Sequence, residues 1–293
     1  MLLEYKPIIQ TIHYKGCDIS VLRLDLIHPE ISGNKWFKLK YNLQQAKAEH
    51  KDTILTFGGA YSNHIAATAF ACNIAGVKSI GIIRGEDITE DNQTLALAKK
   101  NGMNIIPISR EEYKRKRTDD YLNELAIKYP TSYCVPEGGD NELGEKGCKE
   151  ILSKETLHYN KIYCACGTQT TFNGIANSLD TKQKLVGINV LKFDAITNKK
   201  NAVILNKYHF GGYAKHTEAL LNFKSWFECT YDIPLDYIYT TKLFYAVFDL
   251  IDKNEPEETD KILMIHSGGL QGNSGYEKRY NLNPNRQVND PVG

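Results

Sequence analysis

The sequence predicts an α/β fold built around a mainly parallel β-sheet, in one or two domains. Short apolar runs alternate with longer helical patterns, the connections between them are short, and several runs end in glycine-rich turns. The 293 residues are enough for one large domain or two modest ones with an ample hydrophobic core.

The predicted elements alternate along most of the chain. Strands are predicted over seven apolar runs, at residues 52–57, 79–85, 103–109, 132–138, 161–167, 185–191 and 261–269. Helices are predicted between and around them, at residues 35–50, 63–75, 90–101, 110–129, 141–156, 171–179, 213–229 and 240–253. This order is typical of βαβ units, in which ligands bind beyond the C-terminal ends of the strands. The loops directly after strands are therefore where we expect a functional site.

Composition narrows the class of function and the cellular setting. A net charge of +1 with 24% charged residues favours neither nucleic-acid nor membrane binding. The basic run at 114–117 is followed by two aspartates and is interpreted as a solvated helix surface. Seven cysteines, an odd number without Cys-x-x-Cys spacing, and the lack of an apolar run of about 18 residues favour a cytoplasmic protein without a metal site.

A lysine stands where a helix is predicted to begin, in the segment SGNKWFKLKYNL at 32–43. Trp36, Leu39 and Leu43 recur at the spacing of one buried helical face, and Lys35 precedes them. A helix N-terminus disfavours positive charge. Lys35 is either an ordinary solvated lysine after a turn, or an amine whose lowered pKa lets it attack a carbonyl.

The segment TFGGAYSNHIAATA at 56–69 is a strand-to-helix turn rich in small and polar residues. Its two glycines allow a tight turn and a close approach of backbone to a ligand, and Ser62 or Asn63 is predicted to cap the helix. The same residues also suit a capped turn without a ligand.

A second such turn lies in YCACGTQTTFNGIA at 163–176. Its Thr and Gln residues follow a strand and open a helix, an arrangement that can bind an anion through backbone N–H groups and hydroxyls. It is neither a Walker loop nor a dinucleotide fingerprint, so a small ligand with one phosphate fits it better. A serine/threonine turn without a ligand is the alternative.

A third turn, IHSGGLQG at 265–272, again implies close backbone approach at a strand end, or only a tight turn. A lysine at a helix start, a neutral phosphate cradle and small-residue turns together suggest pyridoxal 5'-phosphate (PLP). The aldehyde of PLP needs an amine, and its ring and phosphate need polar partners.

The motifs also resemble those of a known family. From about residue 33 to 272 the chain is similar to the 1-aminocyclopropane-1-carboxylate (ACC) deaminase / D-cysteine desulfhydrase family of PLP enzymes. The matching motifs occur in the family's order: GNKWFKL, GGAYSNH, DNQTLALAKKNG, VPEGGDNELGEKG, CACGTQTTFNGIA, GGYAK, LDYIYTTKLFYAVFDLI and IHSGGLQG. The resemblance implies fold type II, which is tryptophan-synthase-β-like, with two open, mainly parallel sheets flanked by helices. It further implies a large PLP-binding domain of residues 1–39 and 146–293, a small domain of residues 40–145, and a homodimer.

The resemblance also assigns roles to single residues. Lys35 would bind the PLP aldehyde covalently, and Asn63 would hydrogen-bond the phenolic oxygen. The phosphate would be held by Gly167, Thr168, Gln169, Thr170 and Thr171. Catalysis would involve Lys35, Ser62, Tyr213 and Tyr239, and the substrate would contact Ser62, Asn63, His64, Tyr213 and Tyr239. Thr240 would lie near the pyridine nitrogen, and Ser267 would also bind the cofactor. Apart from the resemblance, Lys242 lies in the helix predicted after Tyr239 and is expected at the surface or an interface.

Three positions depart from the deaminase pattern. Thr240 replaces a glutamate, Ser267 replaces a bulky apolar residue, and His64 replaces a glutamine. A hydroxyl leaves the pyridine nitrogen neutral, which makes the ring a weaker electron sink. We therefore expect α,β-elimination from D-cysteine, giving pyruvate, ammonia and sulfide. ACC deamination or another PLP-dependent deamination of a small amino acid is the alternative, and a non-catalytic PLP-binding protein is a further one.

Overall fold

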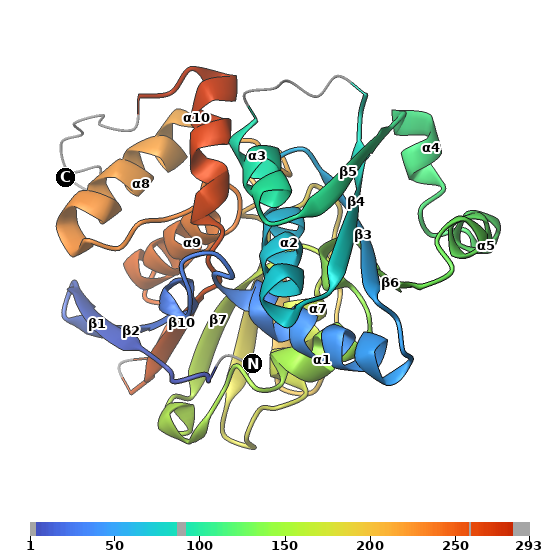
Figure 1. Cartoon of the computed structure of the whole chain (residues 1–293). Coiled ribbons are helices and arrows are strands. Elements are labelled where there is room, and N and C mark those ends of the chain that lie inside the picture. Colours follow the sequence, from blue (N-terminus) through green and yellow to red (C-terminus); the bar gives the residue numbers. More distant parts are fainter. Residues whose placement is uncertain (1–3, 87–91, 258, 284–293) are drawn as a thin grey trace. The chain divides into compact units, whose positions relative to one another are not determined.

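The computed structural model describes residues 4–86, 92–257 and 259–283 (Figure 1). The described residues form two compact units. Unit 1 takes in residue 4, residues 29–31 and the described part of 35–147, and unit 2 takes in the rest. Each unit holds one sheet with helices packed against it, so the predicted α/β class with two mainly parallel sheets is confirmed.

Unit 1 contains a four-stranded parallel sheet in the order β5-β4-β3-β6. Its strands are β3 (Thr53–Gly59), β4 (Lys78–Arg84), β5 (Met103–Ile108) and β6 (Ser132–Val135). Its helices are most of α1 (Asn34–Ala48), α2 (Asn63–Ala75), α3 (Gln93–Lys100), α4 (Arg110–Lys114), α5 (Asp119–Lys128), the 3-10 turn η2 (Glu137–Gly139) and most of α6 (Glu142–Cys148).

Both faces of this sheet are covered, because successive residues of a strand point to opposite sides. Leu55 and Phe57 pack with Tyr113 and other residues of α4 and α5. Ile54, one position away, packs with Ala67 of α2. The strand β3 is therefore buried along almost its whole length, as expected for a parallel sheet between helices.

Unit 2 contains a six-stranded sheet in the order β1-β2-β10-β7-β8-β9. The hairpin of β1 and β2 is antiparallel, and every other pair is parallel. Its strands are β1 (Ile9–Tyr14), β2 (Cys17–Arg23), β7 (Lys161–Cys166), β8 (Lys184–Asn189), β9 (Ala202–Leu205) and β10 (Ile262–His266). Its helices are η1 (Leu24–Leu26), η3 (Lys154–Thr156), α7 (Thr170–Ala176), α8 (Glu218–Tyr231), α9 (Thr240–Asp252), η4 (Leu270–Gly272) and α10 (Asn273–Tyr280).

The core of unit 2 is aromatic on one side of the sheet and tightly packed around α7. Phe227 of α8 and Phe244 of α9 are fully buried in one cluster with strand residues. In β8, a Cβ on Gly187 would lie 2.8 Å from the Phe172 ring of α7 and 2.5 Å from Cys166 Sγ. The glycine is therefore required for α7 to pack this closely on the strands, and α7 carries the predicted phosphate loop at its start.

Several element boundaries differ from those predicted. The strands β1, β2 and β9 were not predicted, and the helix expected at 110–129 is interrupted between α4 and α5, where Thr118 caps the second helix. The helix expected at 213–229 begins only at Glu218, because the backbone φ is positive at residues 210–212 and at residue 214. Residues 90 and 91 of the helix expected at 90–101 lie outside the described residues.

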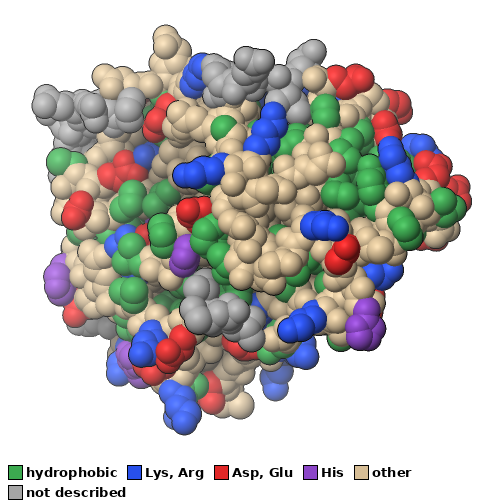
Figure 2. Space-filling model, viewed as in Figure 1, with side chains coloured by type: hydrophobic (Ala, Val, Ile, Leu, Met, Phe, Trp, Pro, Cys, Tyr) green, Lys and Arg blue, Asp and Glu red, His purple; other side chains and the backbone are tan. Residues whose placement is uncertain are grey.

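The basic run at 114–117 is neutralised by neighbouring acids, as a solvated helix surface requires. Figure 2 shows acidic and basic side chains interspersed over the face in view. Each member of the run pairs with a carboxylate: Lys114 with Glu111, Arg115 with Glu124, Lys116 with Glu137 and Arg117 with Asp140. None of the helices in the described ranges is long and apolar enough to cross a membrane.

Candidate active site

The start of helix α1 is held in unit 2 by a close approach of two backbones. Gly33 has φ +72°, and a Cβ at this position would lie 1.8 Å from the carbonyl oxygen of Ser267. The Gly33 N–H donates to Leu24 O at 2.9 Å, and the Asn34 N–H donates to Ser267 O at 3.2 Å. Lys35 is the next residue of the chain, so these contacts set where its backbone begins.

The Asn34 side chain makes a second link, to the predicted phosphate loop. Asn34 Nδ2 donates to Thr171 Oγ1 at 2.8 Å, and both side chains are buried. The sequence suggested only a turn before Lys35, and an asparagine in such a turn can also cap the helix. A cap and a long-range hydrogen bond use the same short amide side chain, so only the folded structure distinguishes them.

The loop after β7 has the properties of an anion cradle. Gln169, the N-cap of α7, has φ +63° and, within the described residues, its side chain does not cap the helix. The hydroxyls of Thr168 and Thr170 lie 2.9 Å apart. The loop thus offers neutral donors at a helix N-terminus, which is a suitable environment for a phosphate group.

The two predicted active-site tyrosines lie close to each other, and one borders this loop. A Cβ on Gly167 would lie 3.1 Å from a Tyr239 ring carbon and 3.5 Å from its phenolic oxygen. The rings of Tyr213 and Tyr239 are 6.4 Å apart between centroids, in an edge-on arrangement. Unit 2 therefore brings together the start of α1, the loop 167–171, both tyrosines and the turn at Ser267.

Thr240 is buried with its hydroxyl engaged by Asp236. The Thr240 hydroxyl accepts from the Asp236 N–H at 2.7 Å and donates to Asp236 Oδ1 at 2.8 Å. The same carboxylate accepts backbone N–H groups of Ile238, Tyr239 and Thr240. These bonds form the start of α9, and the predicted contact of Thr240 with the pyridine ring stays a prediction.

Unit 1 places Ser62, Asn63 and His64 at the C-terminal end of β3. Ser62 is the N-cap of α2, as one of the two predicted alternatives, and its oxygen accepts from the Ile65 N–H at 3.4 Å. A Cβ on Gly58 would lie 2.4 Å from Ile65 Cγ1. The glycine therefore allows the strand end and the helix start to meet in this tight turn.

The hydrogen bonds around His64 define its tautomer. Thr56 Oγ1 donates to Val135 O at 2.8 Å, so it accepts from His64 Nε2 at 2.9 Å. Burial first, and then the charges of Lys35 and Lys38, lower the pKa of His64 to about 3. His64 is thus neutral at ordinary pH, and its Nδ1 is a buried acceptor without a hydrogen-bond partner among the described residues.

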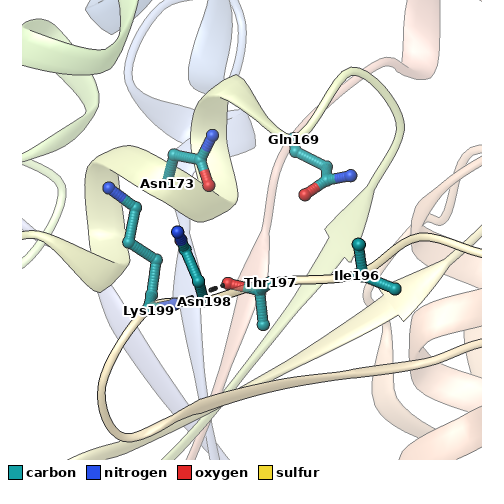
Figure 3. A pocket seen from close by; sticks show the side chains of 6 residues that line it. All are labelled: Gln169, Asn173, Ile196, Thr197, Asn198 and Lys199. Atoms are coloured by element: carbon teal, nitrogen blue, oxygen red, sulfur yellow. Dashed lines mark hydrogen bonds between the residues drawn. The ribbon is translucent and has the colours of Figure 1, made fainter.

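An open pocket shares one residue with the predicted phosphate loop (Figure 3). It is lined by Gln169 and Asn173 on one side and by residues 196–199, between β8 and β9, on the other. Its lining is mostly amide and aliphatic, and Lys199 Nζ donates to Asn177 Oδ1 at 2.9 Å. Of the predicted site residues, only Gln169 lines it.

The expectation that Lys242 lies at the surface or an interface is wrong. Its side chain is wholly buried in unit 2 and bonded to backbone carbonyl groups. The sequence around Lys242 does not distinguish a buried lysine from a solvated one. The carbonyl groups that accept its hydrogen bonds belong to residues 30 or more positions away in the chain.

The sequence matches the family described as pyridoxal-phosphate dependent enzymes over residues 7–268. This chain belongs to that family. The residues of unit 2 fit the cofactor: the loop 167–171 is neutral and offers hydroxyl groups, and Gly167 has no side chain to fill the space beside Tyr239. PLP is its cofactor, as the motifs predicted.

The relatives lie in the group that the motifs indicated. A bifunctional D-cysteine desulfhydrase/ACC deaminase, mitochondrial, from Arabidopsis thaliana is 30% identical over 88% of this chain and 73% of its own length. A putative ACC deaminase from Pyrococcus horikoshii is 29% identical over 89% of this chain and 87% of its own. A crystal structure of an ACC deaminase homologue superposes with a TM-score of 0.80 at 26% identity, covering 95% of this chain and 94% of that one. The family resemblance and the fold type are thereby confirmed, and the chain is a PLP-dependent enzyme.

Proposed function

We propose that this PLP-dependent enzyme is a lyase that catalyses α,β-elimination from D-cysteine, releasing sulfide, ammonia and pyruvate. The observation that carries the proposal is that positions 240 and 267 hold a threonine and a serine, so neither position places a carboxylate beside the cofactor.

The carboxylate nearest in sequence is already saturated. The Asp236 carboxylate accepts hydrogen bonds from three backbone N–H groups and from the Thr240 hydroxyl. Neither this carboxylate nor the Thr240 hydroxyl is therefore available to bind a pyridine nitrogen. Ser267, half-buried at the end of β10, is then the hydroxyl we assign to that nitrogen. A neutral ring withdraws electrons weakly, which favours a reaction that expels a good leaving group such as thiolate over one that opens a carbon ring.

The chain's own groups supply binding and proton transfer. PLP, when bound, supplies an electron sink for the pair left at the substrate Cα. The Lys35 amine would hold the aldehyde and would serve as the base for the substrate Cα proton, with Tyr213 or Tyr239 as the alternative base. Ser62 donates to the substrate carboxylate while its oxygen accepts the Ile65 N–H.

The remaining polar groups hold the cofactor and the substrate in place. The loop 167–171 would hold the phosphate and Asn63 would donate a hydrogen bond to the phenolic oxygen. His64 Nδ1, a buried acceptor, would accept a hydrogen bond from the substrate. Holding the substrate and the Lys35 amine in one fixed orientation would account for a large part of the rate.

The test is product analysis of the purified PLP-loaded protein with D-cysteine, L-cysteine and ACC as separate substrates. We expect sulfide and pyruvate in equal amounts from D-cysteine, and at least about a hundredfold lower kcat/KM for the other two. Lys35→Ala should abolish both turnover and the visible absorbance of bound PLP. Lys47→Ala, an exposed lysine of the same helix, should leave both unchanged. Turnover of ACC at a higher kcat/KM than D-cysteine would refute the proposal.

ACC deamination is the second candidate, because several of the archaeal and bacterial relatives are described as putative ACC deaminases. It predicts 2-oxobutyrate and ammonia from ACC in the same assay. A non-catalytic PLP-binding protein would show the absorbance of bound PLP and its loss in Lys35→Ala, without turnover of any of the three substrates.

We also propose that the enzyme is a cytoplasmic homodimer. The described residues include all seven cysteines, and none of them forms a disulfide, which is typical of a reducing compartment. The dimer is inferred from the family resemblance. Light scattering on the purified protein should give twice the mass of the chain, and a monomer mass at micromolar concentration would contradict it.

A further inference from the structure

Lys242 is a buried amine that the proposed chemistry does not use. It is the third residue of α9, and its side chain has no exposed surface. Its Nζ donates to Gly212 O at 2.7 Å, to His209 O at 2.8 Å and to Val190 O at 3.5 Å. An ammonium has three donors. Each of the three N–H groups of Lys242 therefore has a backbone carbonyl group as acceptor. No carboxylate is among the hydrogen-bond partners of Lys242 in the described residues.

An amine in this position is costly. Burial lowers the pKa of Lys242 to about 8, and the negative charge of Asp236 partly opposes the shift. The three carbonyl oxygens favour the charged form as well, so Lys242 is an ammonium at neutral pH. An apolar side chain of similar length would fill the same space without the desolvation penalty. The presence of an amine at this position is therefore explained by its hydrogen bonds to the backbone, rather than by packing.

That backbone is strained. Phe210 and Ala214 have φ of +51° and +54°, in the left-handed region that is unfavourable for any residue other than glycine. Gly211 and Gly212 between them also have positive φ. Such a segment keeps its conformation only when other contacts enforce it.

The enforcing contacts come from two sides. Lys242 binds the carbonyls of His209 and Gly212, and on the other side the hydroxyls of Tyr276 and Tyr280 donate to Ala214 O at 3.1 and 3.0 Å. The residue between Gly212 and Ala214 is Tyr213. The conformation that these contacts impose therefore determines where the Tyr213 ring lies.

We propose that Lys242 is a positioning residue that holds segment 209–214 in its strained conformation and so keeps Tyr213 beside Tyr239. The connection is short, because Tyr239 immediately precedes α9 and Lys242 lies three residues later on the same helix. The start of α9 therefore fixes both rings of the pair, whose centroids are 6.4 Å apart: Tyr239 directly, and Tyr213 through Lys242. The structural part of this inference stands alone, and its kinetic consequence rests on the proposed role of Tyr213 in the reaction.

The test compares Lys242→Met with Lys224→Met in the PLP-loaded protein. Lys224 is a matched control, because it is also a buried lysine but bonds to the side chain of Glu228, at 2.6 Å. Hydrogen exchange followed by mass spectrometry should show the amides of residues 209–215 exchanging about tenfold faster in Lys242→Met, as expected for losing hydrogen bonds worth about 1.4 kcal/mol. The same amides should be unchanged in Lys224→Met.

A double-mutant cycle on kcat/KM shows whether Lys242 acts through the tyrosine. Lys242→Met and Tyr213→Phe should each lower kcat/KM, and the double variant should be no slower than the slower single variant. Multiplicative effects would overturn the positioning role. Unchanged exchange at 209–215 would overturn the inference outright. If Tyr213→Phe turns over at the normal rate while exchange rises in Lys242→Met, the proposed function of Tyr213 fails and the structural role of Lys242 stands. Should Lys242→Met not fold, Lys242→Gln, which keeps two donors, should show a smaller rise in exchange at the same amides.

Discussion

Replacing Gly33 with alanine is the sharpest perturbation of the backbone that leads into Lys35. A Cβ at this position would lie 1.8 Å from Ser267 O, and contacts under 3.0 Å essentially never occur. The two backbones must therefore part by at least 1.2 Å, the difference between these two values. The hydrogen bond from the Asn34 N–H to Ser267 O, now 3.2 Å, cannot survive such a shift.

The cost can be estimated from its parts. Losing the hydrogen bond costs about 0.5–1.5 kcal/mol of the free energy of unfolding. Holding alanine in the left-handed region costs about 1–2 kcal/mol, less the 0.4–1 kcal/mol or so gained from a stiffer unfolded chain. Gly16→Ala is the matched control, because Gly16 has φ +80° and nothing within 4 Å of the added Cβ. It should lose only about 1 kcal/mol, through its φ alone, and Gly33→Ala should lose roughly 1 kcal/mol more, through the lost hydrogen bond.

Urea unfolding of both variants at one fixed PLP concentration measures the difference, and PLP titration of each measures cofactor affinity. We expect Gly33→Ala to bind PLP more weakly than Gly16→Ala, because the backbone before Lys35 has moved. Equal losses of stability in the two variants would refute the reasoning, since the clash with Ser267 would then contribute nothing.

Three other predictions concern single side chains. Between pH 7 and pH 5 the wild type should lose about 2 kcal/mol more unfolding free energy than His64→Gln, because the unfolded chain binds a proton near pH 6.5 and the folded His64, with a pKa of about 3, does not. This contribution is complete above pH 6.5 and declines as the pH falls towards 3, and parallel urea-unfolding series at the two pH values check it. Thr171→Val should cost about 1–3 kcal/mol and weaken PLP binding, because the buried amide of Asn34 loses its acceptor, whereas Thr171→Ser should retain both properties in the same titrations. Phe227→Ala, at a fully buried site, should cost about 3–5 kcal/mol in thermal or urea unfolding, against a few tenths for Phe193→Ala, which is 61% exposed, and similar values for the two would contradict the assigned core.

Local signals were enough to find most of the elements and the places where a site forms. The turn at Gly58–Gly59 is predictable because a strand that runs directly into a helix needs small residues there. The cap at Ser62 is predictable because a serine hydroxyl can accept a backbone N–H at the start of a helix. The loop 167–171 is recognisable for the same reason. Helix 213–229 was predicted too long, because nothing local shows that Phe210 and Ala214 adopt positive φ.

Contacts between distant segments were not predictable in this way. The hairpin of β1 and β2 joins the sheet of unit 2 through β10, more than 200 residues later in the chain. Arg23, Asp25 and His266 form a buried polar cluster across the same junction. A single sequence does not record which distant residues meet, since the pairing depends on the packing of the whole unit.

The sequence by itself determined the α/β class, the strand-to-helix turns, the cofactor and the family, because these follow from periodicity, turn chemistry and the order of short motifs. The tertiary structure alone decided that Asn34 binds Thr171, that the Thr240 hydroxyl is engaged by Asp236, and that Lys242 is buried under segment 209–214. The physical reason is the same in each case. The sequence does not show whether a polar side chain forms its hydrogen bonds with water or with a distant part of the chain. That is decided only when the folded chain buries the side chain away from water.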